Sequence, residues 1–187
     1  FAITEAARTG NAELVQKLLN QVSVDEEELQ QALFWAAANT NTDIIDSLIG
    51  KIPNVKCFGW PKNLIFRAAA AGHPVLIREL LKRGASVNVP DSQGRRAIHF
   101  ACMAWTNDSL QALAEAGADV NVKDKFGRMP VHFAAGSPNG QCLKYLLENF
   151  NDIDINAVDH DNWTPLMWAA RSGFTTAITE LLSREAD

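Results

Sequence analysis

The sequence predicts an all-α solenoid in which helix-turn-helix units stack side by side and are joined by short β-hairpin loops. The stretch VNVPDSQGRRAIHFAC from Val87 returns as VNVKDKFGRMPVHFAA from Val120, a spacing of 33 residues. Each copy contains segments with helical periodicity, and each is too short to bury its apolar face alone. Because a fixed period of this length is typical of repeat proteins, we expect one elongated array.

The period extends over most of the chain and predicts about six units within a single domain. The units from Asp91, Asp124 and Asp159 are the most regular, and the unit from Phe58 has a weaker start. The two earliest units match only the middle of the pattern. Two extra residues in the Asp124 unit fall after its second helix, which indicates a longer loop rather than a broken core. The predicted units are residues 1–25, 26–57, 58–90, 91–123, 124–158 and 159–187.

Each unit is expected to contain a short Ala-rich helix followed by a longer amphipathic helix. IFRAAAAG and IHFACMAW are first helices, and VLIRELLKRG is a second helix that Gly84 ends in a left-handed conformation, as Gly117 does in the next unit. Gly residues at 10, 72 and 173 separate the two helices. The second helices should supply the core, whose predicted members are Ile45, Leu48, Ile77, Leu80, Leu81, Leu110, Leu113, Leu143, Leu146, Leu147, Ile178, Leu181 and Leu182.

The connections between units are expected to be tight turns. In Asp91–Gly94 and Asp124–Gly127 the Asp side chain can accept hydrogen bonds from nearby backbone N–H groups, and Gly can adopt a positive φ. Asn162 replaces this Gly in the last unit and also tolerates a left-handed conformation. These turns predict short hairpins that project from the stack.

This pattern resembles the ankyrin repeat over essentially the whole chain. TPLMWAARSG from Thr164 follows the family signature Thr-Pro-Leu-His-x-Ala-Ala-x-x-Gly. LLKRGASVN and LAEAGADVN follow its Leu-Leu-x-x-Gly-Ala-x-Val-Asn. The resemblance implies a non-catalytic scaffold that binds a partner protein or peptide. The departures are Arg96-Ala97 in place of Thr-Pro, Met167 in place of the His, and Trp105 and Pro138 in place of the Gly between helices.

The resemblance also implies where a partner binds, because hairpin tips and the exposed ends of first helices line a concave binding face in this family. Aromatic side chains at such tips gain nothing from the core, and interface hot spots favour aromatic residues and Arg. Cations would orient an extended or helical peptide that carries acidic and apolar side chains. The predicted partner-binding residues are Trp60, Lys62, Arg95, Met103, Lys125, Phe126, Arg128, Trp163 and Arg171.

An alternative stays open for the aromatic residues. Trp60 and Trp163 could cover the hairpin of the neighbouring unit instead of contacting a partner. For Trp35 and Trp168, which fall within first helices, packing between units is the favoured interpretation. Arg95, Phe126, Arg128 and Trp163 form the predicted centre of the binding site, because they belong to three consecutive hairpins.

The sequence lacks the residue patterns that catalysis or metal binding requires. His99 and His132 occupy equivalent places in successive units, so we interpret them as structural groups that bond to local backbone. His73 and His160 are expected in solvated turns, and Cys102 replaces an Ala of a packed helix, which predicts an inert buried thiol. We therefore expect no enzyme, no catalytic residue, no metal and no cofactor.

Two further segments have simple structural interpretations. The acidic run DEEELQQ from Asp25 is expected to be a solvated helix start, because acids favour a helix N-terminus, although a metal or partner contact is an alternative. SPNG from Ser137 is expected to be a turn, because it lacks the Gly-rich length and the following Lys of a phosphate-binding loop.

Composition excludes several classes of protein. An apolar share of 47% and a charged share of 21% are normal for a folded chain, and a net charge of −5 argues against sequence-blind nucleic-acid binding. No apolar run approaches the ~20 residues that a membrane span needs. Three Cys without a Cys-x-x-Cys pair fit a reducing compartment, so an intracellular location, in the cytoplasm or nucleus, is expected.

The beginning of the sequence suggests a piece of a longer protein, because Phe1 lies partway through a unit. Two functions therefore stay open. The first is an interaction scaffold with no chemistry of its own. The second is a regulatory or targeting segment of a larger multidomain enzyme, channel or pathogen effector.

Overall fold

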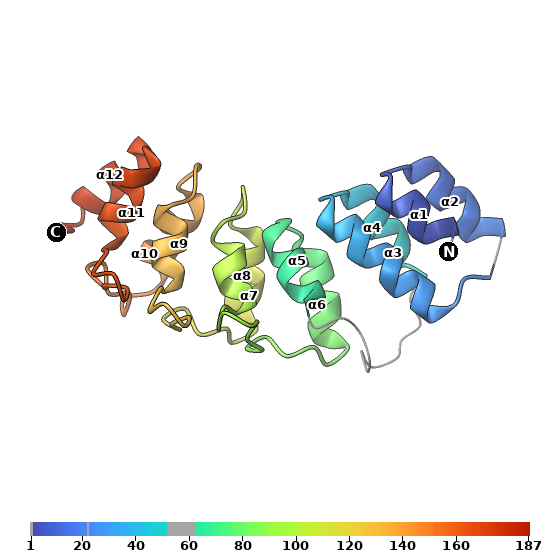
Figure 1. The fold of residues 1–187 in the computed structure, drawn as a ribbon, viewed down its shortest axis with the longest axis horizontal. Helices are drawn as coiled ribbons and strands as arrows, with labels where there is room; N and C mark the ends of the chain where they lie inside the picture. Colours follow the sequence, from blue (N-terminus) through green and yellow to red (C-terminus); the bar gives the residue numbers. More distant parts are fainter. Residues whose placement is uncertain (1, 22, 52–62) are drawn as a thin grey trace.

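The structure, a computed structural model, describes residues 2–21, 23–51 and 63–187 and shows an elongated row of helix pairs (Figure 1). Within these ranges the chain forms twelve α-helices and no strand, which confirms the all-α prediction. The first helices of the pairs are α1 (Ala2–Arg8), α3 (Glu26–Ala38), α5 (Leu64–Ala70), α7 (Ala97–Ala101), α9 (Pro130–Ala135) and α11 (Pro165–Ser172). The second helices are α2 (Ala12–Gln21), α4 (Thr42–Ile49), α6 (Pro74–Lys82), α8 (Asp108–Glu115), α10 (Gln141–Asn149) and α12 (Thr175–Leu182).

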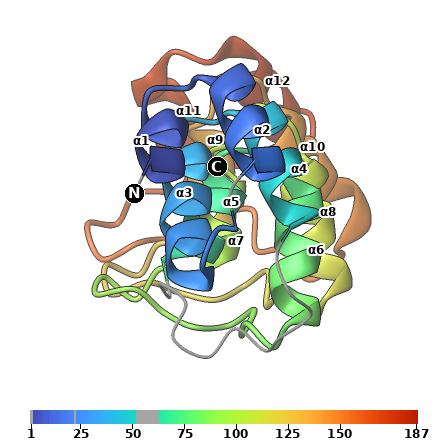
Figure 2. The ribbon, with the colours of Figure 1, turned by 90° about the vertical axis from the view of Figure 1, so that its right-hand side faces the viewer.

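The helices form two layers. The first helices contact one another in order from α1 to α11, and α2, α4, α6 and α8 do the same in the other layer. Figure 2 shows the layers side by side, with the loops between pairs extending past the layer of first helices. We call the side that carries the first helices and these loops the inner face, and the side that carries the second helices the outer face.

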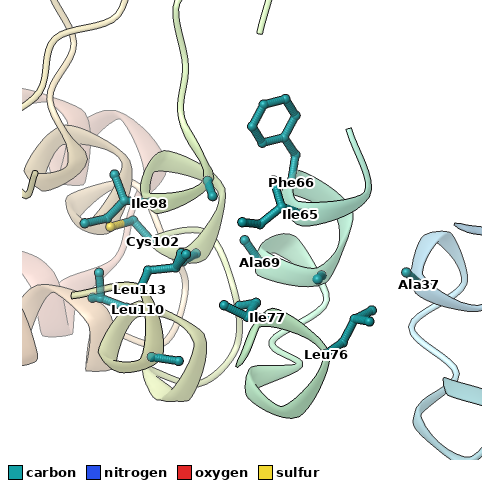
Figure 3. Close-up of a cluster of buried hydrophobic side chains, with 14 of the residues drawn as sticks. Ala37, Ile65, Phe66, Ala69, Leu76, Ile77, Ile98, Cys102, Leu110 and Leu113 are labelled. Carbon is teal, nitrogen blue, oxygen red and sulfur yellow. The ribbon is translucent and has the colours of Figure 1, made fainter. Parts of the chain in front are cut away.

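The core lies between the layers and between successive pairs. In Figure 3, Ile65 of α5 points toward α7, and Ile77 of α6 points toward α8. Nine of the predicted core residues are buried, as expected: Ile45, Leu48, Ile77, Leu80, Leu110, Leu113, Leu143, Leu146 and Leu181.

Four predicted core residues lie outside the fully buried set. Leu81 and Leu147 each follow a buried Leu by one position, which turns them about 100° around the helix to its half-buried flank. Ile178 is also half-buried, and Leu182 is 54% exposed, because no described helix pair packs against that side of α12. The prediction was therefore wrong for Leu182, and it overstated the burial of the other three.

Side-chain caps explain where several helices begin. Asp25 accepts a hydrogen bond from the Glu28 N–H at 2.7 Å, which confirms that DEEELQQ starts a helix. His73 is 5% exposed, and its Nδ1 accepts the Leu76 N–H at 3.0 Å to cap α6. The prediction that His73 is solvated was thus wrong, because the helix start needs an acceptor and the imidazole supplies it.

The predicted left-handed positions are confirmed. Gly84 and Gly117, which follow second helices, have φ values of +91° and +83°, and Asn162 has a φ of +61°. The turn from Ser137 and the exposed position of His160 also agree with the sequence. No helix among the described residues is both long and apolar enough to cross a bilayer.

Candidate functional site

Each hairpin loop is organised by one aspartate. The Asp91 carboxylate accepts the backbone N–H groups of Gln93 and Arg95 through Oδ1, both at 2.8 Å. Its Oδ2 accepts the Nε–H of Arg95 at 2.9 Å, and the guanidinium pairs with it a second time at 2.8 Å. Backbone bonds from Asp91 N–H to Arg95 O and from Gly94 N–H to Asp91 O close the loop. The loop is therefore a hairpin turn without a strand.

The next hairpin repeats this arrangement. Asp124 Oδ1 accepts the N–H groups of Phe126 and Arg128 at 2.8 and 2.9 Å, and Oδ2 accepts Arg128 Nε–H at 2.8 Å. The prediction of tight Asp-x-x-Gly turns is confirmed in both places. The Arg at the fifth position, a predicted partner-binding residue, also stabilises the hairpin.

In the last hairpin, different residues donate hydrogen bonds to the aspartate. Asp159 Oδ1 accepts the N–H groups of Asp161 and Trp163, both at 2.9 Å. Trp163 stands where the earlier hairpins have Arg, so Oδ2 accepts instead the indole Nε1–H of Trp168 at 3.0 Å. A buried carboxylate oxygen needs a donor, and an indole from α11 supplies it here.

These bonds keep the carboxylates of Asp91 and Asp159 ionised. Burial raises the pKa of Asp91, but the Arg95 guanidinium and the backbone N–H groups outweigh it and hold that pKa below its ordinary value. For Asp159, burial is again outweighed, here by the Trp163 N–H and the Trp168 indole, so its pKa is also lowered. Both hairpins are therefore stiff at neutral pH.

Neighbouring hairpin tips are joined to one another. Lys125 N–H donates to Gln93 O at 2.9 Å, and His160 N–H donates to Phe126 O at 2.9 Å. Gly94 and Gly127 permit this approach, since a Cβ on Gly94 would lie 3.1 Å from the Lys125 backbone nitrogen and one on Gly127 2.6 Å from the His160 ring. Three successive tips thus form a continuous row.

The two equivalent histidines tie these hairpins to the helices. His99 Nδ1 accepts the Arg96 N–H at 2.9 Å, so its Nε2–H donates to Val122 O at 3.2 Å. His132 bonds in the same way to Met129 N–H at 3.0 Å and Ala157 O at 3.0 Å. Burial lowers the pKa of both rings, although nearby aspartates and backbone hydrogen bonds act to raise it. The predicted structural role is confirmed.

The predicted cations fall into two groups. Arg95 lies over the Phe100 ring at 4.6 Å and Arg128 over Phe126 at 4.8 Å, and both are paired with the hairpin aspartates. Their charges are therefore compensated within the protein. Lys125 and Arg171 are exposed, and neither has an ion-pair partner in the part of the chain that the structure describes.

The predicted apolar residues are exposed to different extents. Met103 is 42% and Phe126 48% exposed on the inner face. Trp163 is half-buried, packs edge-to-face on Trp168 at 6.4 Å, and lies under Arg171 at 5.4 Å. Trp60 and Lys62 lie outside the described residues.

The two helix tryptophans have different surroundings. Trp168 stacks on Phe133 of the preceding pair at 6.5 Å, as expected for packing between units. Trp35 is 38% exposed and lies edge-to-face against Phe34 of the same helix, so its packing between units stays a prediction.

Arg67 and Trp105 are exposed but were not among the predicted partner-binding residues. Arg67 is exposed on α5 and lies over the Phe34 ring at 5.3 Å. In register it occupies the place of Trp35, Phe100, Phe133 and Trp168, so aligning the units would have revealed a cation within a column of aromatic residues. Trp105 is 75% exposed between α7 and α8, and its substitution for Gly was the available signal.

The described residues contain no group of three His, Cys, Asp or Glu side chains that could hold a metal ion. Cys102 and Cys142 are buried free thiols. Burial raises the pKa of Cys102 well above its ordinary value and that of Cys142 to about 11, so neither is a reactive thiolate at neutral pH.

Comparison with known protein families gives a match to ankyrin repeats. A model of three repeat copies matches residues 33–124 and residues 104–187, which together extend from residue 33 to residue 187. A comparison with curated proteins gave no match.

Proposed function

Because this chain belongs to the ankyrin repeat family, whose members are generally protein–protein interaction modules, we propose that its inner face binds a partner protein or peptide. Ankyrin repeat proteins are typically non-enzymatic scaffolds, and the proposal includes no catalytic residue, metal or cofactor. The binding residues are those predicted from the sequence, with Arg95, Phe126, Arg128 and Trp163 at the centre.

The observation that carries this proposal is the row of hydrogen-bonded hairpin tips. Phe126 is 48% exposed in the middle of this row, between the bonds from Lys125 to Gln93 and from His160 to Phe126. A large exposed apolar side chain on a rigid backbone loses little entropy on binding, which favours a high-affinity contact. Met103 and Trp163 extend the apolar surface along the inner face.

The charges of the same face suggest the chemistry of the partner. Lys125 and Arg171 flank the apolar residues and are free to meet carboxylates. An extended or helical peptide with acidic and apolar side chains would complement them, with the cations orienting the peptide. The net charge of −5 does not favour nucleic acid.

The proposal places this function in a single intracellular domain over residues 1–187, with the six unit boundaries given above. The buried free thiols of Cys102 and Cys142 fit a reducing compartment. A regulatory or targeting segment of a larger multidomain enzyme, channel or pathogen effector is the alternative, and it would use the same face.

The proposed site can be tested once a partner has been captured with the purified 1–187 segment. Phe126→Ala and Trp163→Ala should each weaken binding by about 1–4 kcal/mol, because truncation of an aromatic hot spot has this effect. Dissociation constants measured by calorimetry give the change, and melting temperatures show that the fold is kept.

Val75→Ala is the matched control, since Val75 is 51% exposed on α6 of the outer face. It should leave the affinity unchanged. Unchanged affinity in both aromatic variants, with melting temperatures preserved, would move the site away from the inner face.

A further inference from the structure

We propose that a groove on the inner face, between α5, α7 and the hairpin that contains Asp91, is a pocket for an Asp or Glu side chain of the bound peptide. This inference rests on the proposed function and names the ligand chemistry of one part of that surface. The groove has a volume of about 540 Å³. Its lining residues are Asn63, Phe66, Arg67, Ala70, Pro90, Asp91, Ser92, Arg95 and Phe100.

Two stacked rings give the groove an apolar floor. Phe66 of α5 and Phe100 of α7 lie 5.3 Å apart with an angle of 18° between their planes. Figure 3 shows Phe66 pointing from α5 away from Leu76 and Ile77 of α6, so the ring belongs to the inner face rather than to the space between layers. This floor can contact the methylene groups of an acidic side chain and those of its apolar neighbour in the peptide.

Arg67 supplies an uncompensated charge at the wall of the groove. Its guanidinium lies over the Phe34 ring at 5.3 Å, and it forms no ion pair with any described residue. A ring beneath a guanidinium orients it but leaves its N–H groups free in the plane for a carboxylate. The cation is thus held in place without being neutralised.

Three cations of the outer face, in contrast to Arg67, are paired with carboxylates of the chain. Arg78 pairs with Glu115 at 3.6 Å, Lys144 with Glu148 at 3.8 Å, and Arg184 with Glu180 at 2.9 Å. These cations have carboxylates of their own chain nearby. Arg67 shares the lack of an ion pair with Lys125 and Arg171, but it also lines a groove, where a ligand carboxylate could supply the missing partner.

The other charges of the groove leave it cationic. Arg95 and Asp91 neutralise each other, with the guanidinium over Phe100 at 4.6 Å. With Arg67, the lining therefore carries two guanidinium groups and one carboxylate, a net charge of +1. A carboxylate fits this charge and the fork of N–H donors on Arg67, whereas a Lys side chain would be repelled and a Gln side chain would lose the charge-assisted bonds.

The inference predicts a preference that peptide pools can measure. Immobilised ten-residue pools would carry Glu, Gln or Lys at a fixed central position between randomised flanks, and the purified 1–187 segment would be the soluble probe. The Glu pool should retain about tenfold more protein than the Gln pool, because one charge-assisted pairing is worth roughly that factor. The Lys pool should retain the least.

Three variants assign the preference to the groove. Arg67→Gln should abolish the difference between the Glu and Gln pools, and Arg67→Lys should retain part of it. Ser92→Glu, on the exposed hairpin tip, adds a carboxylate at the rim and should also reduce retention by the Glu pool. Arg78→Gln makes the same change of charge on the outer face and should keep the full preference.

Several outcomes would overturn the pocket. Equal retention by the Glu and Gln pools would contradict it. A preference for the Glu pool that persists in both Arg67→Gln and Ser92→Glu, with their melting temperatures unchanged, would also contradict it. If pools are retained and Phe126→Ala weakens them while Glu and Gln remain equal, the pocket is wrong but the proposed binding face stands. If no pool is retained, the pocket is also wrong, and the captured partner alone decides the function of the face.

Discussion

At the scale of single residues, side-chain acceptors bond the otherwise unpaired backbone N–H groups at the start of several helices. The N–H groups of a first helical turn have no partner within the helix. His99 and His132 each accept one backbone N–H and donate to a carbonyl of the loop that leads to the next unit. In the last unit Met167 replaces the histidine, and Thr164 Oγ1 accepts the Met167 N–H at 3.3 Å instead. Met167 is consequently free to be exposed.

The buried histidines make stability depend on pH. Burial lowers the pKa of His99, His132 and His73 below the ordinary value of 6.5. The unfolded chain therefore binds these protons more readily than the folded chain. The stabilisation is complete above about pH 6.5 and is lost as the pH falls through the lower, folded-state values. We expect a smaller free energy of unfolding at pH 5.5 than at pH 7.5, measured by urea denaturation.

Substitution separates this effect from general acid sensitivity. His99→Gln and His132→Gln should each lower stability at pH 7.5 but flatten its fall toward pH 5.5. His160→Gln, on an exposed tip, should leave the fall unchanged. Asp91 and Asp159 have lowered pKa values and act in the same direction only below about pH 4. A fall that is equally steep in all three variants would contradict the assignment.

The core leucines should differ sharply according to the face on which they lie. Leu146 is fully buried in α10, whereas Leu182 of α12 is 54% exposed. Leu146→Ala should cost about 2–5 kcal/mol of unfolding free energy, because it removes buried methyl groups and leaves a cavity. Leu182→Ala should cost less than about 1 kcal/mol. Equal losses in chemical denaturation would mean that the second helices face differently.

At the scale of elements, the hairpin is the unit that combines structure with the proposed binding surface. Asp91 and Asp124 each accept two backbone N–H groups and one arginine, and the tips bond to one another along the row. A tip that shifted would lose a bond to its neighbour. The hairpins therefore present Phe126 on a backbone that is fixed before any partner arrives.

Two glycines with similar backbone conformations test this stacking. Gly127 and Gly117 have φ values of +76° and +83°, so Ala at either position has the same backbone strain of about 1–2 kcal/mol. A Cβ on Gly117 meets nothing within 4 Å, whereas one on Gly127 lies 2.6 Å from the His160 ring and 3.1 Å from its backbone nitrogen. Gly127→Ala should therefore be the more destabilising in urea denaturation, by at least about 1 kcal/mol.

The larger loss of stability in Gly127→Ala should be accompanied by loss of the hydrogen bond between neighbouring tips. The His160 amide, which donates to Phe126 O, should exchange its hydrogen faster in Gly127→Ala and at an unchanged rate in Gly117→Ala. If the two variants are equally stable, the tips are not in contact in solution.

The sequence was sufficient for the elements but not for the chemistry between them. Its period and its Gly positions predicted the helix pairs and left-handed caps, because these depend on local patterns that recur. Burial of His73 was missed, since a turn position in the sequence does not show that the helix start will use the ring as its cap. The pairing of Arg95 with Asp91 was also missed, so a residue predicted to be free for a partner is partly engaged.

The groove could not be predicted from the sequence. Arg67 looks like an ordinary solvent-exposed cation in the sequence, and only the packed units bring it beside Phe100 and Ser92. Contacts between units depend on the offset of one pair from the next, which a repeat pattern does not specify. The candidate site was thus predicted at the level of the face, and its pocket required the structure.

At the scale of the whole molecule, each helix pair is supported mainly by its neighbours. The main contacts of α11 are with α9 and α12. Those of α8 are with α5, α6 and α7. In such an array stability is approximately a sum of unit and interface contributions. A defect at one end should therefore remain local, whereas a defect in the middle should weaken both halves.

Hydrogen exchange can test this consequence with two equivalent truncations. Leu181 of α12 and Leu113 of α8 are both fully buried, so Ala at either position removes a similar amount of apolar contact. Leu181→Ala should raise exchange in α11 and α12 and leave α1–α6 protected, because only one interface connects the last pair to the array. Leu113→Ala should raise exchange on both sides of α8, since its pair lies between two others (Figure 1). If Leu181→Ala deprotects α1–α4 as strongly as α12, the array unfolds as one cooperative block.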